Sequence, residues 1–197
     1  MIVARQFRRQ WACAAVLLLF GSGVLSSGQT AASKGTRISL GTVAAPPKGE
    51  VMAPLYLAPD PPEVRVGKIS ARIRFDGDRF TFVRAEKGFL LDGVGGEVRA
   101  TLEKGPQQTG RASILLEVAT KGEPRKPLRE GLILTLVFGI GESAPMGQSF
   151  PLAIEEALAT DIADPPKAIQ PLVSENGAIE VIRPEEVPYV ACFFFSH

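Results

Sequence analysis

Apolar and polar residues alternate along most of the chain from Arg37 onward. In residues 69–75 an apolar side chain occupies every second position, and Ser70, Arg72 and Arg74 stand between them. A period of two places successive side chains on opposite faces of a β-strand. The pattern therefore predicts a strand that buries one face and exposes the other.

A turn is predicted directly after this strand. Asp76, Gly77 and Asp78 form a short polar segment, and the alternation resumes at Phe80 and Phe82. Glycine adopts the positive φ angles of tight turns, and an aspartate side chain can accept a hydrogen bond from its own backbone. The two alternating segments are therefore expected to form a hairpin.

Further strands are predicted from the same period. Residues 98–102 and 114–118 alternate in the same way, and residues 132–138 are apolar on both faces apart from Thr135. A strand that is apolar on both faces is typical of the centre of a sandwich. Shorter outer strands are expected at residues 38–43, 51–57, 149–154 and 178–182, between proline-rich turns. Residues 155–162 fit either a helical turn or a continuation of the strand before them.

The fold class follows from the number and type of these elements. The strands number about nine, and no segment carries the period of a long amphipathic helix. An alternation of strands with helices is therefore disfavoured. The sequence predicts an all-β fold, an antiparallel β-sandwich of the jelly-roll type with about nine strands.

The composition and the net charge limit the kinds of partner that are expected. The chain has 197 residues, of which 45% are hydrophobic, and this supports one well-buried core. The net charge is +1, and the lysines and arginines are scattered rather than gathered into a basic stripe. Nucleic acid and anionic membranes are therefore not expected as partners.

The N-terminal 32 residues read as a secretory signal peptide. Arg5, Arg8 and Arg9 precede an apolar run at residues 11–20, and small residues follow up to Ala32. An uncleaved membrane anchor is the weaker alternative, because a spanning helix needs about 20 apolar residues. The expected mature protein is secreted, extracellular or held in the cell envelope, periplasm included, and has no transmembrane helix. Its domain covers residues 33–182, and residues 183–197 form a proline-containing arm with an apolar tail.

Three stretches of the predicted domain resemble one known family. They are residues 49–57, residues 66–83 with the aromatic and Asp turn at Phe75 and Asp76, and residues 131–152 with the strand that begins Gly131-Leu132. These stretches are similar to the cohesin family, the receptor modules of cellulosome scaffolds, and the likeness extends over residues 38–182. The resemblance implies a jelly roll without catalytic activity that binds a dockerin-like protein; an envelope assembly factor is the other protein partner considered. The same fold occurs in carbohydrate-binding modules, so a polysaccharide is the alternative partner.

Catalysis has little support in the sequence. His197 is the single histidine and the last residue, so no histidine-based triad or histidine-rich metal site can form within one chain. A pair of carboxylates from Asp76, Asp78, Glu86 and Asp92 would be the remaining basis for a glycosidase. An Asp-Gly-Asp sequence between strands is more typical of a turn. The protein is therefore expected not to be an enzyme.

No cofactor is expected, although a structural calcium ion is chemically plausible. Asp76 with Asp78, or Asp161 with Asp164, would supply the oxygen ligands that calcium prefers. A sugar-stacking platform is not evident. Trp11 is the single tryptophan and lies in the signal peptide, and Tyr56 is expected in the core.

The C-terminal tail is the least ordinary segment. Residues 189–195 are apolar and far shorter than a membrane span. Either they form a last strand on their own sandwich, or they are donated to an open sheet edge of another protein. The second alternative makes the tail the partner-binding site: Tyr189, Val190, Cys192, Phe193, Phe194 and Phe195. Cys192 is the single cysteine of the mature chain, and it is either inert or available for an intermolecular bridge.

Overall fold

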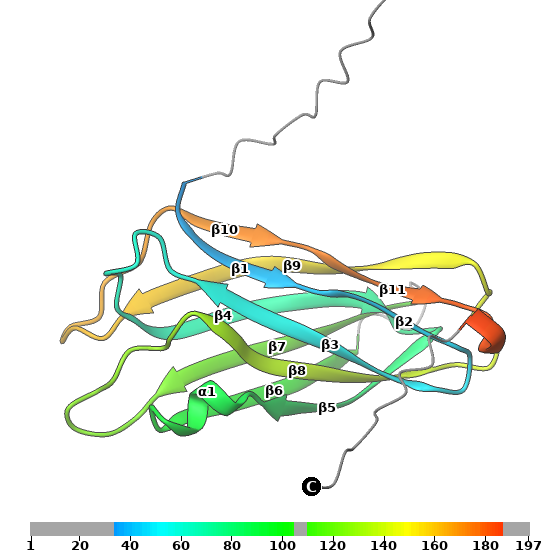
Figure 1. Cartoon of the computed structure of the whole chain (residues 1–197), viewed down its shortest axis with the longest axis horizontal. Helices are drawn as coiled ribbons and strands as arrows, with labels where there is room; N and C mark the ends of the chain where they lie inside the picture. Colours follow the sequence, from blue (N-terminus) through cyan, green and yellow to red (C-terminus); the bar gives the residue numbers. More distant parts are fainter. Residues whose placement is uncertain (1–33, 105–109, 187–197) are drawn as a thin grey trace, which may run out of the picture. The chain divides into compact units, whose positions relative to one another are not determined.

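The structure, a computed structural model, describes residues 34–104 and 110–186. Eleven strands in this part of the chain form two sheets that face each other (Figure 1). In spatial order the first sheet contains β10 (Leu172–Glu175), β1 (Thr36–Leu40), β3 (Glu50–Ala58), β8 (Gly131–Ile140) and β5 (Phe80–Lys87). The second contains β2 (Thr42–Ala45), β11 (Gly177–Val181), β9 (Gln148–Asp161), β4 (Val66–Asp76), β7 (Arg111–Thr120) and β6 (Gly96–Lys104). The predicted all-β jelly-roll sandwich is confirmed.

Two short helical turns complete the described elements. The turn α1 (Phe89–Asp92) connects β5 to β6, and the 3-10 turn η1 (Pro184–Glu186) follows β11. No helix within residues 34–104 and 110–186 combines the length and apolar character required to cross a membrane.

The core lies between the sheets and is built by the alternating residues. Ile73 of β4, Ile114 of β7 and Leu55 of β3 have no exposed surface. Phe138 of β8 is equally buried, and its ring meets the ring of Phe75 edge to face, with 5.2 Å between centroids. Each such side chain contributes about 1.5–3 kcal/mol of burial free energy. The sandwich therefore rests on apolar packing.

Near each end of the domain the chain passes from the first sheet to the second, and the two passages lie side by side. The strand β1 pairs in parallel with β10, and β2 pairs in parallel with β11, while the other seven pairings are antiparallel. Gly41 and Gly177 lie at the crossing, where a Cβ on Gly177 would clash with the carbonyl oxygen of Gly41. The Asn176 side chain accepts a hydrogen bond of 2.8 Å from the backbone N–H of Ile154. It replaces a backbone acceptor where the ladder is interrupted.

The predicted hairpin after residue 75 is wrong. The strand β4 pairs with β7 and β9, whereas β5 pairs with β8 in the other sheet. Asp76 accepts hydrogen bonds from the backbone N–H groups of Asp78 and Arg79, at 3.1 and 3.2 Å. The N–H of Gly77 donates to Gly110, so the turn is held by the strand beside it. The chain therefore leaves its sheet here and crosses to the opposite one.

Other strand expectations are refined. The predicted strand at 38–43 is divided between β1 and β2, β10 was not foreseen, and residues 155–161 continue β9. The interior position of β8 is confirmed, because β3 and β5 flank it and its outward-facing Val137 is as buried as its inward-facing Phe138. The predicted signal peptide at residues 1–32 and most of the arm at residues 183–197 lie outside the described residues.

Candidate functional site

The outer surface of β9, β4, β7 and β6, hereafter the β4–β7 face, carries the best-organised set of polar side chains. Because Ile69, Ala71 and Ile73 point into the core, the residues between them point outward. The outward residues used below are Lys68, Ser70, Arg72 and Arg74 on β4, Leu115 and Glu117 on β7, Glu97, Arg99, Thr101 and Glu103 on β6, and Glu155, Glu156 and Leu158 on β9.

Arg72 links three strands at the centre of this face. Its Nε donates to Glu156 Oε2 at 3.0 Å, and its Nη1 lies 2.7 Å from Glu103 Oε2. The hydrogen bond to Glu156, followed by the charges of Glu156 and Glu103, raises the pKa of Arg72. The guanidinium thus holds two carboxylates from strands on either side of its own in fixed positions.

A β-bulge on β9 makes this arrangement achievable. The register between β4 and β9 shifts between Ser70 and Arg72, and Glu156 has a φ of 50°. A bulge inserts an extra residue and turns a side chain that would otherwise point inward. Glu155 can therefore pair with Arg74 at 2.7 Å while its neighbour Glu156 pairs with Arg72 on the same face. The positive φ of Glu156 is the strained element of the site.

Further ion pairs line the same face. Lys68 Nζ lies 2.8 Å from Glu117, and Lys121 Nζ lies 2.5 Å from Glu97. The hydrogen bond from Lys121 lowers the pKa of Glu97. Exposed ion pairs of this kind contribute little to stability. Their effect is to fix a pattern of charge on the surface.

An open hollow of about 420 Å³ lies among these pairs. Leu115 and Leu158 line it, with 37% and 59% of their surface exposed. Arg99 lines it too and forms no ion pair with any residue in the described part of the chain. The hollow thus combines two exposed leucines with arginines and carboxylates on one surface.

Two of the aspartates considered as calcium ligands accept hydrogen bonds within the turns in which they lie. Both oxygens of Asp76 are engaged, one by backbone N–H groups and the other by Arg79. Asp161 accepts hydrogen bonds from the N–H groups of Ala163 and Lys167, at 3.2 and 2.8 Å. Within residues 34–104 and 110–186 no three His, Cys, Asp or Glu residues gather as a metal site would require. Calcium binding at these aspartates stays a prediction.

The carboxylates considered for catalysis are held by separate partners. Glu86 pairs with Arg84 at 2.7 Å, and Asp92 pairs with Lys87 at 2.6 Å. Glu86 lies near the end of β5 and Asp76 lies before its start, so the strand separates them. Of the four carboxylates considered, Asp76 and Asp78 share one turn, whereas Glu86 lies near the end of β5 and Asp92 lies beyond it.

The structure corrects one prediction about this protein's surface and leaves another untested. Tyr56 was expected in the core, but it points outward from β3 with 42% of its surface exposed. The predicted partner-binding tail, from Tyr189 to Phe195, lies outside the described residues. Leu115 and Leu158 were not predicted as site residues from the sequence. The signal for Leu115 is an apolar residue at an outward position, between the inward residues Ile114 and Leu116.

Comparison with solved structures identifies the fold. A cohesin from Acetivibrio cellulolyticus in complex with a dockerin matches with a TM-score of 0.58 and 18% identity, over 75% of this chain and 99% of that chain. A cohesin from a Clostridium thermocellum cohesin–dockerin complex matches with a TM-score of 0.58 and 14% identity, over 76% and 100%. A non-cellulosomal cohesin from the archaeon Archaeoglobus fulgidus matches with a TM-score of 0.57 and 16% identity, over 77% and 94%.

These matches define the fold of the chain. The chain is a jelly-roll β-sandwich, and the structures that match it are cohesin domains. The fold is therefore cohesin-like, as the resemblance in the sequence implied. No protein-family model matches the sequence, and no curated protein matches it either. At these identities the likeness establishes the fold alone.

Proposed function

We propose that this protein is a non-catalytic module that binds another protein through the β4–β7 face. The hollow in which Leu115 and Leu158 lie exposed beside Arg72 carries the proposal. Binding energy at protein interfaces concentrates in a few side chains that lose water on contact, and arginine is prominent among them. Because Arg72 is already held by Glu103 and Glu156, little side-chain entropy remains to be lost on binding.

The partner is proposed to be a dockerin-like protein or an envelope assembly factor. The Acetivibrio and Clostridium structures are of cohesins together with dockerins, and the shared fold supports a comparable role here. The arginine-rich start of the chain and the apolar run after it support export, so we place this binding outside the cytoplasm or in the cell envelope.

A protein fits this face better than a polysaccharide does. Carbohydrate-binding surfaces use exposed aromatic rings as stacking platforms. In the described parts of β4, β6, β7 and β9 no aromatic side chain is among the outward residues of the β4–β7 face. On the opposite face Tyr56 is the exposed aromatic residue of the described strands, and one ring is no strip. The mixture of leucines and paired charges therefore supports protein recognition.

The test is a pull-down from the extracellular and envelope fractions of the producing organism, with the full chain as bait. The wild type is compared with the double variant Leu115→Thr/Leu158→Thr, because threonine suits a strand but removes most of the apolar surface. The control is Met52→Thr/Tyr56→Thr on the opposite outer face. A protein captured by the wild type and the control but lost with the leucine variant is the expected result.

Two outcomes would contradict the proposal. Capture that is equal for the leucine variant and the wild type would move the binding site away from the β4–β7 face. Retention of the chain on an insoluble polysaccharide, with no protein captured in a leucine-dependent manner, would make carbohydrate recognition the function. Thermal unfolding of each variant confirms that the fold is intact.

A further inference from the structure

A second apolar surface lies on the other side of the sandwich. Met52, Pro54 and Tyr56 point outward from β3, and Leu132 and Val137 point outward from β8. We call these five residues the β3–β8 band. The pairing register sets Met52 beside Val137, Pro54 beside Thr135 and Tyr56 beside Leu132, so the five apolar side chains adjoin one another around a single threonine.

The band is apolar and partly exposed, although Val137 within it is fully buried. Met52 and Tyr56 have 52% and 42% of their surface exposed. The described part of the chain places no strand or helix over this side of the sheet, and Figure 1 shows β3 and β8 running in front of the other sheet without a further layer. A contiguous apolar surface of this kind usually has an occupant.

The charges beside the band are already paired with one another. On one flank Arg84 contacts Glu86 at 2.7 Å and Glu50 at 3.7 Å. On the other flank Arg37 lies 3.1 Å from Glu175. Each of these arginines on the described flanks thus has a carboxylate beside it, so the expected occupant of the band is an uncharged apolar segment.

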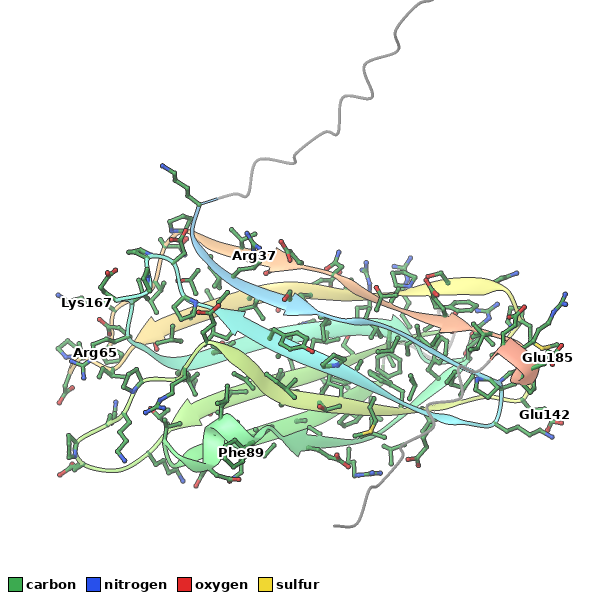
Figure 2. The ribbon with its side chains drawn as sticks, viewed as in Figure 1. Arg37, Arg65, Phe89, Glu142, Lys167 and Glu185 are labelled. Carbon is green, nitrogen blue, oxygen red and sulfur yellow. The ribbon has the colours of Figure 1, made fainter. Side chains whose placement is uncertain are left out.

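The chain has such a segment where the described residues end. Residues 189–195 contain no charged residue, and they include three consecutive phenylalanines. The N–H of Ile182, four residues before Glu186, donates to Ala45 at 3.2 Å, and β3 begins five residues after Ala45. Figure 2 shows Glu185 of η1 at the same end of the sandwich as Glu142, which pairs with Lys48 just before β3. The tail therefore starts at the end of the sandwich where the band begins.

The tail is long enough to cover the band. Residues 187–197 can span up to about 36 Å when extended, at about 3.3 Å per residue. The distance along β3 from Glu50 to Tyr56 is six residues, or about 20 Å. We propose that the β3–β8 band is the docking surface for residues 189–195 of the same chain. Two apolar surfaces that are costly to expose then shield each other from water.

Tethering strengthens this contact. A segment joined to its binding surface by a few residues has a local concentration of about millimolar. The intramolecular contact therefore competes well against a second copy of the chain in dilute solution. It is also independent of the partner proposed for the β4–β7 face, because the band lies on the opposite sheet.

Cys192 provides a direct test by disulfide trapping. All variants carry Cys13→Ser in the full chain, so that Cys192 is the single native thiol. Met52→Cys then places a second thiol in the band, and Leu158→Cys places one of similar exposure on the opposite face as the matched control. Each variant is oxidised at low concentration with oxidised glutathione, and the products are mapped by peptide mass spectrometry.

The expected result is an intrachain disulfide between Cys192 and the thiol introduced at position 52. It should form at least about tenfold faster than with Leu158→Cys, because a disulfide requires Cα atoms within about 7 Å. Equal rates for the two variants, or interchain disulfides alone, would overturn the proposal. Met52 is exposed, so its replacement leaves the core intact.

A second measurement needs no added cysteine. In the Cys13→Ser chain, Cys192 should react with a thiol reagent more slowly than in urea, and Tyr56→Ser should raise its reaction rate toward the unfolded value. A rate that Tyr56→Ser leaves unchanged would show that the band does not cover the tail. Circular dichroism verifies that the Tyr56→Ser chain is folded.

Discussion

The two outer faces of the sandwich present apolar side chains in different surroundings. On the β4–β7 face Leu115 and Leu158 stand apart, among arginines and glutamates that pair across the strands. On the opposite face the five residues of the β3–β8 band are contiguous, and the ion pairs are confined to the flanks. Isolated leucines within a fixed charge pattern favour selective recognition, whereas a continuous apolar band favours permanent cover. This difference is the basis for proposing a partner at the first face and the chain's own tail at the second.

The strands at the two ends of the domain cross between the sheets at Gly41 and Gly177, and this crossing connects the two outer faces. A substitution at the crossing should therefore have the largest effect on the free energy of unfolding. Gly177→Val would place side-chain atoms against the carbonyl of Gly41 and against Leu40. We expect the free energy of unfolding to fall by about 3 kcal/mol, a typical cost of overpacking against backbone. Urea unfolding measures the change.

A second glycine provides the control for this prediction. Gly93 has open space around its Cα and a φ of −68°, which alanine adopts without strain. Gly93→Ala should change stability by no more than about 0.5 kcal/mol. If Gly177→Val were as stable as Gly93→Ala, the crossing would not connect the two faces as the structure indicates.

Removing the leucines should separate the functions of the two faces. For the captured partner, Leu115→Thr/Leu158→Thr should weaken binding by about 30-fold, equivalent to about 2 kcal/mol. Met52→Thr/Tyr56→Thr should change the affinity by less than about twofold, since these residues lie on the other sheet. Calorimetric titration gives both values. Equal losses from the two double variants would remove the distinction between the faces.

Replacing the strained residue of the bulge should affect stability and partner binding in opposite directions. Glu156 has a φ of 50°, a conformation that glycine adopts more readily. Glu156→Gly should raise the free energy of unfolding by about 0.5 kcal/mol, as the relief of strain exceeds the entropy cost of glycine. The same variant should weaken partner binding, because Arg72 loses one of its two carboxylates.

Lys48 supplies the matched control, since its φ is 65° and it lies outside the β4–β7 face. Lys48→Gly should give a comparable gain in stability with unchanged affinity. Denaturation and titration of both variants distinguish the effects. A loss of affinity in Lys48→Gly would show that backbone relaxation, rather than the loss of the carboxylate, weakens binding.

The fold was largely predictable because the inward residues follow a strict period of two. Ile69, Ile73 and Phe75 are buried as the alternation required. The hairpin prediction failed because Asp76 and Gly77 indicate a reversal of the chain without specifying which strand receives it. The strand β10 was missed because it has four residues and pairs with β1, more than 130 residues away in sequence.

The candidate site was much less predictable. Arg72 meets Glu103 and Glu156, which are 31 and 84 residues away in the sequence. No local pattern reports such contacts, because they depend on the strand order and on the bulge. The outward position of Leu115 could be predicted from the alternation of apolar and polar residues. Its neighbours in the hollow could not be predicted.

The smallest expected effect concerns the ion pairs at the rim of the β4–β7 face. Lys121 lowers the pKa of Glu97 through a hydrogen bond, so the charged carboxylate favours the folded state. That contribution is present above the pKa of an unfolded glutamate, about 4.3, and is lost as the pH falls through the lower folded pKa. Glu97→Gln should therefore be slightly less stable than the wild type at pH 7, and equally stable once the pH is low enough to protonate Glu97 in both states. Urea unfolding across this range checks the sign, and Lys121→Met should show the same pH dependence. A stability difference that persisted in acid would mean that packing rather than charge holds Glu97, and the charge pattern that distinguishes this face would then lose one of its fixed pairs.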